Sequence, residues 1–91
     1  MLNNEEIIEN IEKIKDMGYL VIVEGKKDMK ALKNLGINNV VSLKNRPLFE
    51  IVENVNDREV VLLTDLDTEG RKLFSKLKYL LQRRGVKLNN E

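Results

Sequence analysis

The feature that most constrains the fold of this chain is an apolar, β-branched segment that ends in two aspartates. Residues 60–67 read Val-Val-Leu-Leu-Thr-Asp-Leu-Asp, and Thr-Glu-Gly follows them. Such a run predicts a buried strand. Because residues two apart on a strand point the same way, Asp65 and Asp67 can aim at one point. Two carboxylates at that spacing indicate a site for a hard divalent cation, which prefers oxygen ligands.

The remaining hydrophobic pattern predicts an alternation of helices and strands. We expect helices over residues 3–17, 27–35, 47–55 and 69–84, and strands over residues 19–23, 40–43, 59–64 and 86–88. Alternation with short connections implies right-handed crossovers and a parallel sheet. We therefore predict an α/β fold in which about four mostly parallel strands are flanked by helices on both faces, with an extra N-terminal helix over residues 1–17.

A third carboxylate is expected at the same place. The strand predicted over residues 19–23 runs directly into Glu24 and Gly25. In open parallel sheets, ligands bind outside the carboxyl ends of the strands. Glu24, Asp65 and Asp67 all fall at such ends, so spacing and topology both predict one acidic, metal-dependent site.

Gathering three carboxylates costs free energy. At a separation of about 5 Å and an effective dielectric constant of about 20, each pair repels by roughly 3 kcal/mol, whereas a small domain has only about 5–10 kcal/mol of total stability. Bound Mg²⁺ or Mn²⁺ offsets this repulsion. The alternative is that Asp65 caps the helix that begins near Thr68 and that Glu24 pairs with Lys26 or Lys27. That alternative explains neither the shared direction of the two aspartates nor the position of Glu24.

Composition limits the chemistry. Ninety-one residues suit a single domain over residues 1–91, and the absence of cysteine and histidine excludes disulfides, thiolate metal sites and imidazole catalysis. The chain has no apolar run long enough to cross a membrane and no basic N-terminal segment of the signal-peptide type. We therefore expect a cytoplasmic protein with no membrane partner, whose chemistry uses carboxylates, lysines, arginines, hydroxyls and water.

The basic residues are clustered although the net charge is only +1. One group lies on the first helix after Glu24, and the other lies between residues 71 and 87, where no acidic residue occurs. Such clusters track a phosphate backbone or form solvated helix faces, and both interpretations stay open. Lys26, Lys27 and Arg71 flank the acidic site and are the candidates for phosphate contact. For Tyr19 and Tyr79, the pattern favours packing roles.

These residues resemble the two signature motifs of the Toprim domain. Residues 23–28 read Val-Glu-Gly-Lys-Lys-Asp, and residues 64–70 read Thr-Asp-Leu-Asp-Thr-Glu-Gly. The domain is shared by topoisomerases of types IA and II, bacterial primases, OLD-family nucleases, recombination mediators and small ribosomal-RNA maturases. The resemblance covers about residues 19–88 and implies a Rossmann-like Toprim core. The second motif is most similar to that of type IA topoisomerases, the first resembles that of the small maturases and primases, and the N-terminal helix with a short body resembles small stand-alone Toprim proteins. Toprim domains often continue through a further strand and helix, so a chain ending at Glu91 is either a minimal domain or a fragment.

The resemblance implies a role for each matching residue. Glu24 matches the family glutamate, a general acid or base in strand cleavage or transfer and sometimes a metal ligand. Asp65 and Asp67 match the pair that holds Mg²⁺. Glu69 matches an acidic position of the topoisomerases, and its role here is open. From physical reasoning, Gly25 and Gly70 are expected to allow tight turns and close approach of a phosphate, although Gly70 could equally be a packing glycine.

The residues and the resemblance lead to two hypotheses for the function. The first is metal-dependent phosphodiester chemistry on DNA or RNA, with nuclease-type hydrolysis favoured because no tyrosine neighbours the motifs as a nucleophile. The second is a non-catalytic module that binds nucleic acid or a protein partner within a larger assembly. Two other classes do not fit. Haloacid dehalogenase phosphatases carry Asp-x-Asp on their first strand, and receiver domains carry their acidic pair after the first strand and a lone aspartate after the third.

Overall fold

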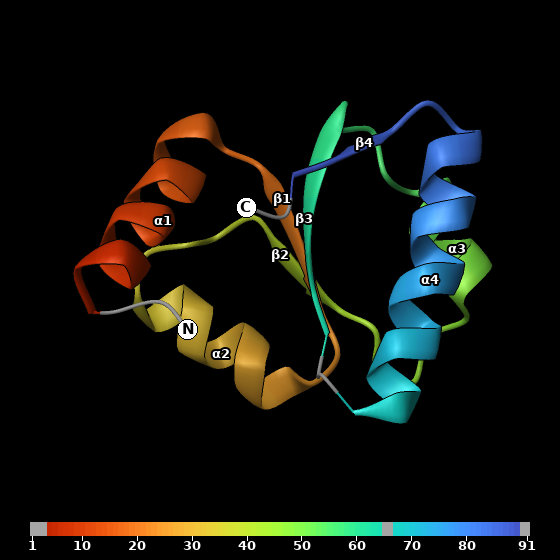
Figure 1. The fold of residues 1–91 in the computed structure, drawn as a ribbon, viewed down its shortest axis with the longest axis horizontal. Helices are drawn as coiled ribbons and strands as arrows, with labels where there is room; N and C mark the ends of the chain where they lie inside the picture. The colour runs from red at the N-terminus through yellow and green to blue at the C-terminus, as the bar shows by residue number, and fades with distance from the viewer. Residues whose placement is uncertain (1–3, 65–66, 90–91) are drawn as a thin grey trace.

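The computed structural model describes the backbone of residues 4–64 and 67–89, and the side chains from residue 9 onward within those ranges. Three layers are visible in Figure 1. Helices α1 (Asn4–Met17) and α2 (Lys26–Asn34) cover one face of a sheet, and helices α3 (Leu48–Glu53) and α4 (Thr68–Arg83) cover the other. The expected α/β architecture, with helices on both faces and an additional N-terminal helix, is confirmed.

The sheet is parallel throughout the part of the chain that the structure describes. Its strands are β1 (Leu20–Val23), β2 (Val40–Ser42), β3 (Glu59–Leu63) and β4 (Lys87–Leu88), in the order β2-β1-β3-β4. Strand β1 pairs with both β2 and β3, and its residue Val23 lies opposite Ser42 on one side and Leu63 on the other. The two central strands therefore end at the same level, and the segments that leave them start from one edge of the sheet.

Side chains on β1 and β3 alternate between two hydrophobic cores. Leu20, Ile22, Val60 and Leu62 face α3 and α4 and pack with buried helix residues such as Leu77. Val21, Val23 and Val61 face α1 and α2, where the second core forms. This double-sided burial is the reason for the continuous apolar runs in the sequence, since a strand covered on both faces needs apolar residues at every position.

Glycines end three of the helices as the sequence indicates. Gly18, Gly36 and Gly85 follow α1, α2 and α4 with φ angles of 67°, 92° and 81°. These are left-handed conformations that glycine adopts without a steric penalty. Helix α3 begins at Leu48, one residue later than predicted, because Pro47 is the N-cap of this helix and not its first helical residue.

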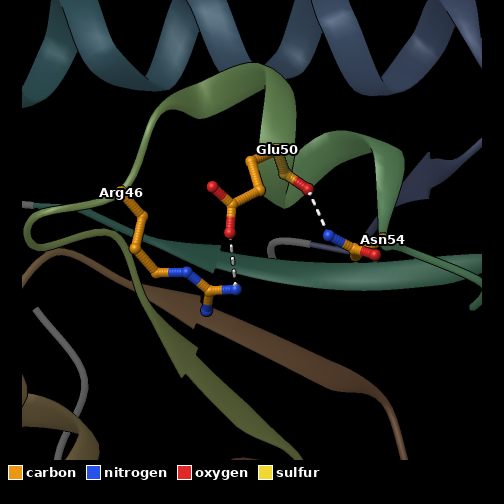
Figure 2. A network of polar contacts seen from close by, with 3 residues as sticks. All are labelled: Arg46, Glu50 and Asn54. Atoms are coloured by element: carbon orange, nitrogen blue, oxygen red, sulfur yellow. Dashed lines mark hydrogen bonds and ion pairs between the residues drawn. The ribbon is translucent and has the colours of Figure 1, made fainter.

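A polar network closes the short helix α3 (Figure 2). Arg46, in the loop before the helix, lies 3.5 Å from the Glu50 carboxylate, and Asn54 Nδ2 donates a 2.8 Å hydrogen bond to the Glu50 carbonyl. Both charged side chains are more than 40% exposed, so this ion pair contributes at most about 1 kcal/mol. It links the loop to the helix, while Ile51 and Val52 hold the helix to the core.

The two tyrosines differ in their surroundings. Tyr19 is half-buried and packs against the core beneath α1 and α2. Tyr79 is 60% exposed on α4, so the expectation that it is a packing residue is wrong. Position 79 lies on the solvent side of α4, opposite Leu77 and Leu81, which fill the core beneath the helix.

Among the described residues, no helix is long and apolar enough to span a membrane.

The buried face of α4 should dominate the stability of the fold. Leu77 is completely buried, whereas Leu35 at the end of α2 is 51% exposed. We expect Leu77→Ala to lower the free energy of unfolding by about 2–5 kcal/mol, because it removes a core side chain and leaves a cavity. Leu35→Ala, the matched control, should cost less than about 1 kcal/mol. Urea denaturation measures both, and equal losses would contradict this account of the packing.

Candidate functional site

The candidate site lies at the edge of the sheet where β1 and β3 end. Glu24 follows β1 directly, and Asp67 follows β3 after a short connection. Helices α2 and α4 begin at this same edge, in the lower part of Figure 1. Parallel pairing of the two strands brings together segments that are about forty residues apart in the sequence, with Val23 opposite Leu63. This is the edge at which parallel α/β sheets bind ligands.

The backbone at Glu24 is fixed by the neighbouring strand. Leu43 N donates a 2.9 Å hydrogen bond to the Val23 carbonyl, and the Ser42 hydroxyl donates a 3.4 Å bond to the Glu24 carbonyl. Ser42 Oγ also accepts a 3.2 Å bond from Lys44 N. The serine is buried and the Glu24 residue is half-buried. Ser42 thus positions the end of β1, a role that its sequence context did not reveal.

Asp67 is the N-cap of α4. Its Oδ1 accepts a 2.7 Å hydrogen bond from Gly70 N, and its backbone is extended, with φ −72° and ψ 176°. The capping alternative raised for Asp65 therefore applies to Asp67 in the structure. A carboxylate has two oxygens, so the cap bond leaves Oδ2 outside this interaction. The residue Asp67 is exposed, which allows a ligand to reach it.

The remaining members of the predicted site are only partly described. Asp65 lies outside the described residues, so its place in the site stays a prediction. Within the described ranges, no group of three acidic side chains is arranged to hold a metal ion. Glu24 and Asp67 nevertheless follow two neighbouring strands, β1 and β3, and both carry carboxylate oxygens. Oxygen donors of this kind fit Mg²⁺ or Mn²⁺.

Basic side chains surround the acidic edge. Lys26 and Lys27 form the first turn of α2, Arg71 lies in the first turn of α4, and all three residues are exposed. The N-cap of α2, Gly25, makes no side-chain capping hydrogen bond. The N-terminus of a helix attracts anions because its first N–H groups lack partners within the helix. The three basic residues therefore lie in the first turns of the two helices that follow β1 and β3, and Asp28 and Glu69 lie in the same two turns.

The two glycines differ from the expectation. Gly25 has φ −118° and ψ 163°, which any residue adopts, and a Cβ placed on it would lie 3.7 Å from Asp28 Oδ2, at ordinary contact distance. The turn itself therefore does not require glycine, and the close approach of a phosphate stays a prediction. Gly70 is buried in the first turn of α4.

Two further acidic residues lie at the start of the helices. The Asp28 carboxylate, in the first turn of α2, lies over the Gly25 turn, and Glu69 is exposed in the first turn of α4. An acidic residue in a first helical turn interacts favourably with the helix dipole. That position is the sequence signal by which Asp28 could have been found, although it was not among the predicted site residues.

Comparison with known proteins places this geometry in a family. The family model for the Toprim domain matches residues 18–90. The chain belongs to the Toprim domain family. Toprim domains generally depend on Mg²⁺ and act on nucleic acids.

Relatives of this Toprim domain occur in archaea and bacteria. The chain is 40% identical over 77 residues to a UPF0292 protein of Thermococcus gammatolerans, covering 82% of this chain and 58% of that protein. It is 33% identical over 93 residues to a UPF0292 protein of Methanocaldococcus jannaschii, covering 96% and 73% respectively. A solved structure of a protein from Aquifex aeolicus is similar to this fold, with 33% sequence identity and a TM-score of 0.84. The match covers the whole of this chain and 84% of the Aquifex chain. The chain thus spans less than two thirds of the length of some relatives.

The capping bond of Asp67 separates its structural role from metal binding. Without metal, Asp67→Asn should leave the melting temperature nearly unchanged, because asparagine caps helices as well as aspartate does. Asp67→Ala should lower stability by about 1 kcal/mol, or about 4–8 °C in a domain of this size.

Added Mg²⁺ should raise the melting temperature of the unmodified chain, by the equivalent of about 2.7 kcal/mol at a hundredfold excess over Kd. It should not raise the melting temperature of either variant. Thermal denaturation followed by circular dichroism measures all three chains with and without metal. A metal response that survives in Asp67→Asn would remove Asp67 from the ligand set.

Proposed function

We propose that this Toprim domain hydrolyses phosphodiester bonds in nucleic acid with the help of Mg²⁺ or Mn²⁺. The observation that carries the proposal is the parallel pairing of β1 and β3, because Glu24 follows the first of these strands and Asp67 comes shortly after the second. Exposed Lys26, Lys27 and Arg71 lie in the first turns of the helices that follow the two strands. An acidic centre inside a basic rim suits a substrate that is itself a polyanion and reacts at phosphorus.

The metal would be held by Asp65, Asp67 and Glu24. When bound, it would offset negative charge on the phosphate and stabilise the charge that develops during the displacement. The carboxylates of the protein supply the hard oxygen ligands that this ion prefers. Asp67 would combine this role with its cap bond to Gly70, since the bond engages only one of its two oxygens.

Glu24 would transfer the proton. It would accept a proton from the attacking water or donate one to the leaving oxygen, as a positioned carboxyl group does in general acid–base catalysis. The chain has no histidine, so no imidazole competes for this role. The hydrogen bonds from Ser42 and Leu43 to the carbonyls of Glu24 and Val23 hold the backbone from which the Glu24 side chain extends.

The basic rim would bind the phosphates. Lys26 and Lys27 stand at an N-terminus of α2 that has no side-chain cap, so backbone N–H groups and ammonium groups can share one phosphate. Arg71, one turn into α4, offers a planar guanidinium that can contact two phosphate oxygens at once. These contacts would position the substrate without reading its sequence.

Hydrolysis fits the structure better than transfer through a covalent tyrosine. Tyr79 is twelve residues beyond Asp67 on α4, about 18 Å along the helix. Tyr19 precedes β1, and thus lies at the opposite edge of the sheet. Neither hydroxyl adjoins the acidic residues, so water is the nucleophile that the arrangement supports.

A non-catalytic module is the second candidate. One observation favours it, because the Asp67 carboxylate already has a structural role as the cap of α4. In that case the basic rim would bind nucleic acid or a protein partner within a larger assembly, and the carboxylates would not support turnover.

Substitution at the acidic centre and at the rim should have different effects. We expect Glu24→Gln to lower the cleavage rate by at least about a hundredfold, the usual size of a general acid–base contribution, with little change in binding. Lys27→Ala should weaken binding and lower the slope of log K against log salt by about 0.7–0.9. Lys33→Ala, in the last turn of the same helix, is the matched control and should do neither.

Cleavage of labelled RNA hairpins, single-stranded DNA and duplex DNA with Mg²⁺ or Mn²⁺ measures the rates, and fluorescence anisotropy measures binding. Loss of activity in all three variants would point to misfolding, which circular dichroism checks. A chain that binds these substrates with metal present yet cuts none of them would overturn the enzyme proposal in favour of the binding module.

A further inference from the structure

An exposed stripe of basic and aromatic side chains runs along α4. Lys72, Lys76, Tyr79 and Arg83 are spaced by four, three and four residues, which places them on one side of a helix. All four residues are exposed, whereas Gly70, Leu77 and Leu81 are buried on the side that faces the sheet. The stripe therefore belongs to the outer surface of the molecule, on the right-hand side of Figure 1.

Tyr79 is the unusual member of this stripe. It is 60% exposed, and the guanidinium carbon of Arg83 lies 5.6 Å from the centre of its ring. That is the distance of a cation–π contact, which restrains both side chains. Tyr79 is not among the residues that pack in the core beneath α4, so core packing does not account for an aromatic ring here. An exposed ring next to a cation is a platform on which a nucleobase can stack.

Positive charge is concentrated around this ring. Residues 70–88 hold seven of the sixteen basic residues of the chain and none of its fifteen acidic residues. Arg83 also lines an open hollow between α3 and α4, together with Phe49, which is 63% exposed. Glu53 lines the same hollow and lowers its charge, so the favourable potential is strongest along Lys72, Lys76 and Arg83.

We propose that the stripe binds a single-stranded segment of the nucleic acid that the site at the sheet edge acts on. This inference rests on the function proposed above. A base would stack on Tyr79, and Lys72, Lys76 and Arg83 would contact the flanking phosphates. The phosphate contacts follow from charge complementarity, and the stacking selects single strands, because the faces of paired bases are covered by their neighbours in a duplex.

The dimensions agree with this partner. Lys72 and Arg83 are eleven residues apart, which is about 16 Å along a helix and matches about five stacked nucleotides at about 3.4 Å each. Asp67 is the N-cap of α4, so a nucleic-acid strand that lies along this helix leads toward Asp67. The stripe would thus extend the binding surface away from the site in one direction.

Binding without metal tests the stripe separately from cleavage. The chain is mixed in EDTA with fluorescein-labelled single-stranded DNA, single-stranded RNA and duplex DNA, and anisotropy gives each Kd. We expect Tyr79→Ala to weaken binding to the single strands about tenfold, the loss expected for one stacked base. Tyr79→Phe keeps the ring and should bind like the unmodified chain. Duplex affinity should be the same in all three proteins.

Charge and stacking have separate controls. Lys76→Ala should lower the slope of log K against log salt by about 0.7 for single strands, whereas Lys13→Ala, an exposed lysine on α1, should leave it unchanged. The chain has no tryptophan and only two tyrosines. In a Tyr19→Phe background, tyrosine emission therefore reports on Tyr79 alone and should be quenched by a single strand.

Three results would overturn the inference. The first is that Tyr79→Ala and Tyr79→Phe bind single strands with equal affinity. The second is that Tyr79→Ala loses as much affinity for duplex DNA as for single strands. The third is that tyrosine emission does not change when a single strand binds. Failure of the proposed function gives a different pattern, in which the stripe binds as expected but no substrate is cut when Mg²⁺ or Mn²⁺ is added. Because Tyr79 is exposed and alanine favours helices, its variants should fold, which circular dichroism verifies.

Discussion

The parallel pairing of β1 with β3 is the interaction on which the rest of the structure depends. These strands are the two central ones of the sheet, and their side chains supply both hydrophobic cores. Their register sets Val23 beside Leu63, so the residues after each strand emerge at one edge. A shift of one residue would turn every side chain of a strand to the opposite face. The burial that stabilises the fold thus also sets the edge at which the segments after β1 and β3 begin.

Acidic and basic residues lie close together in the sequence segments that leave this edge. Carboxylates occupy the strand ends, while Lys26, Lys27 and Arg71 occupy the first turns of two helices. Asp67, a predicted metal ligand, is also part of the scaffold, because its Oδ1 accepts the capping hydrogen bond from Gly70 N in the first turn of α4. A ligand that binds the Asp67 carboxylate would therefore contact the capping group of α4, the helix that carries the exposed stripe. This shared residue is a physical link between the acidic centre and the surface proposed for single strands.

Much of the fold was predictable from the sequence because its signals are local and repeated. Apolar runs mark β1 and β3, helical spacing marks α4, and Gly18, Gly36 and Gly85 lie where left-handed residues end helices. The residue-level chemistry of the site was harder to predict. An aspartate before a helix serves equally as a cap or as a metal ligand, and only the hydrogen bond of Asp67 shows that it caps. Gly25 lies in a turn without needing the freedom of glycine. Tyr79 lies two residues from each of the buried leucines Leu77 and Leu81, so helical spacing already indicated its exposed position, and the prediction of a packing role overlooked that spacing.

The central claim is that the carboxylates at the ends of β1 and β3 hold a divalent metal. Paramagnetic broadening by Mn²⁺ in the amide NMR spectrum tests it most directly, because Mn²⁺ takes the same hard oxygen ligands as Mg²⁺ and broadens the signals of nearby amides. At low Mn²⁺ the amide signals of Glu24, Gly25 and residues 67–71 should broaden first. Signals at the opposite edge, at Gly18 and Arg58, should stay sharp, and excess Mg²⁺ should restore the broadened signals. Broadening centred on any other part of the chain, or broadening that Mg²⁺ does not reverse, would contradict the claim.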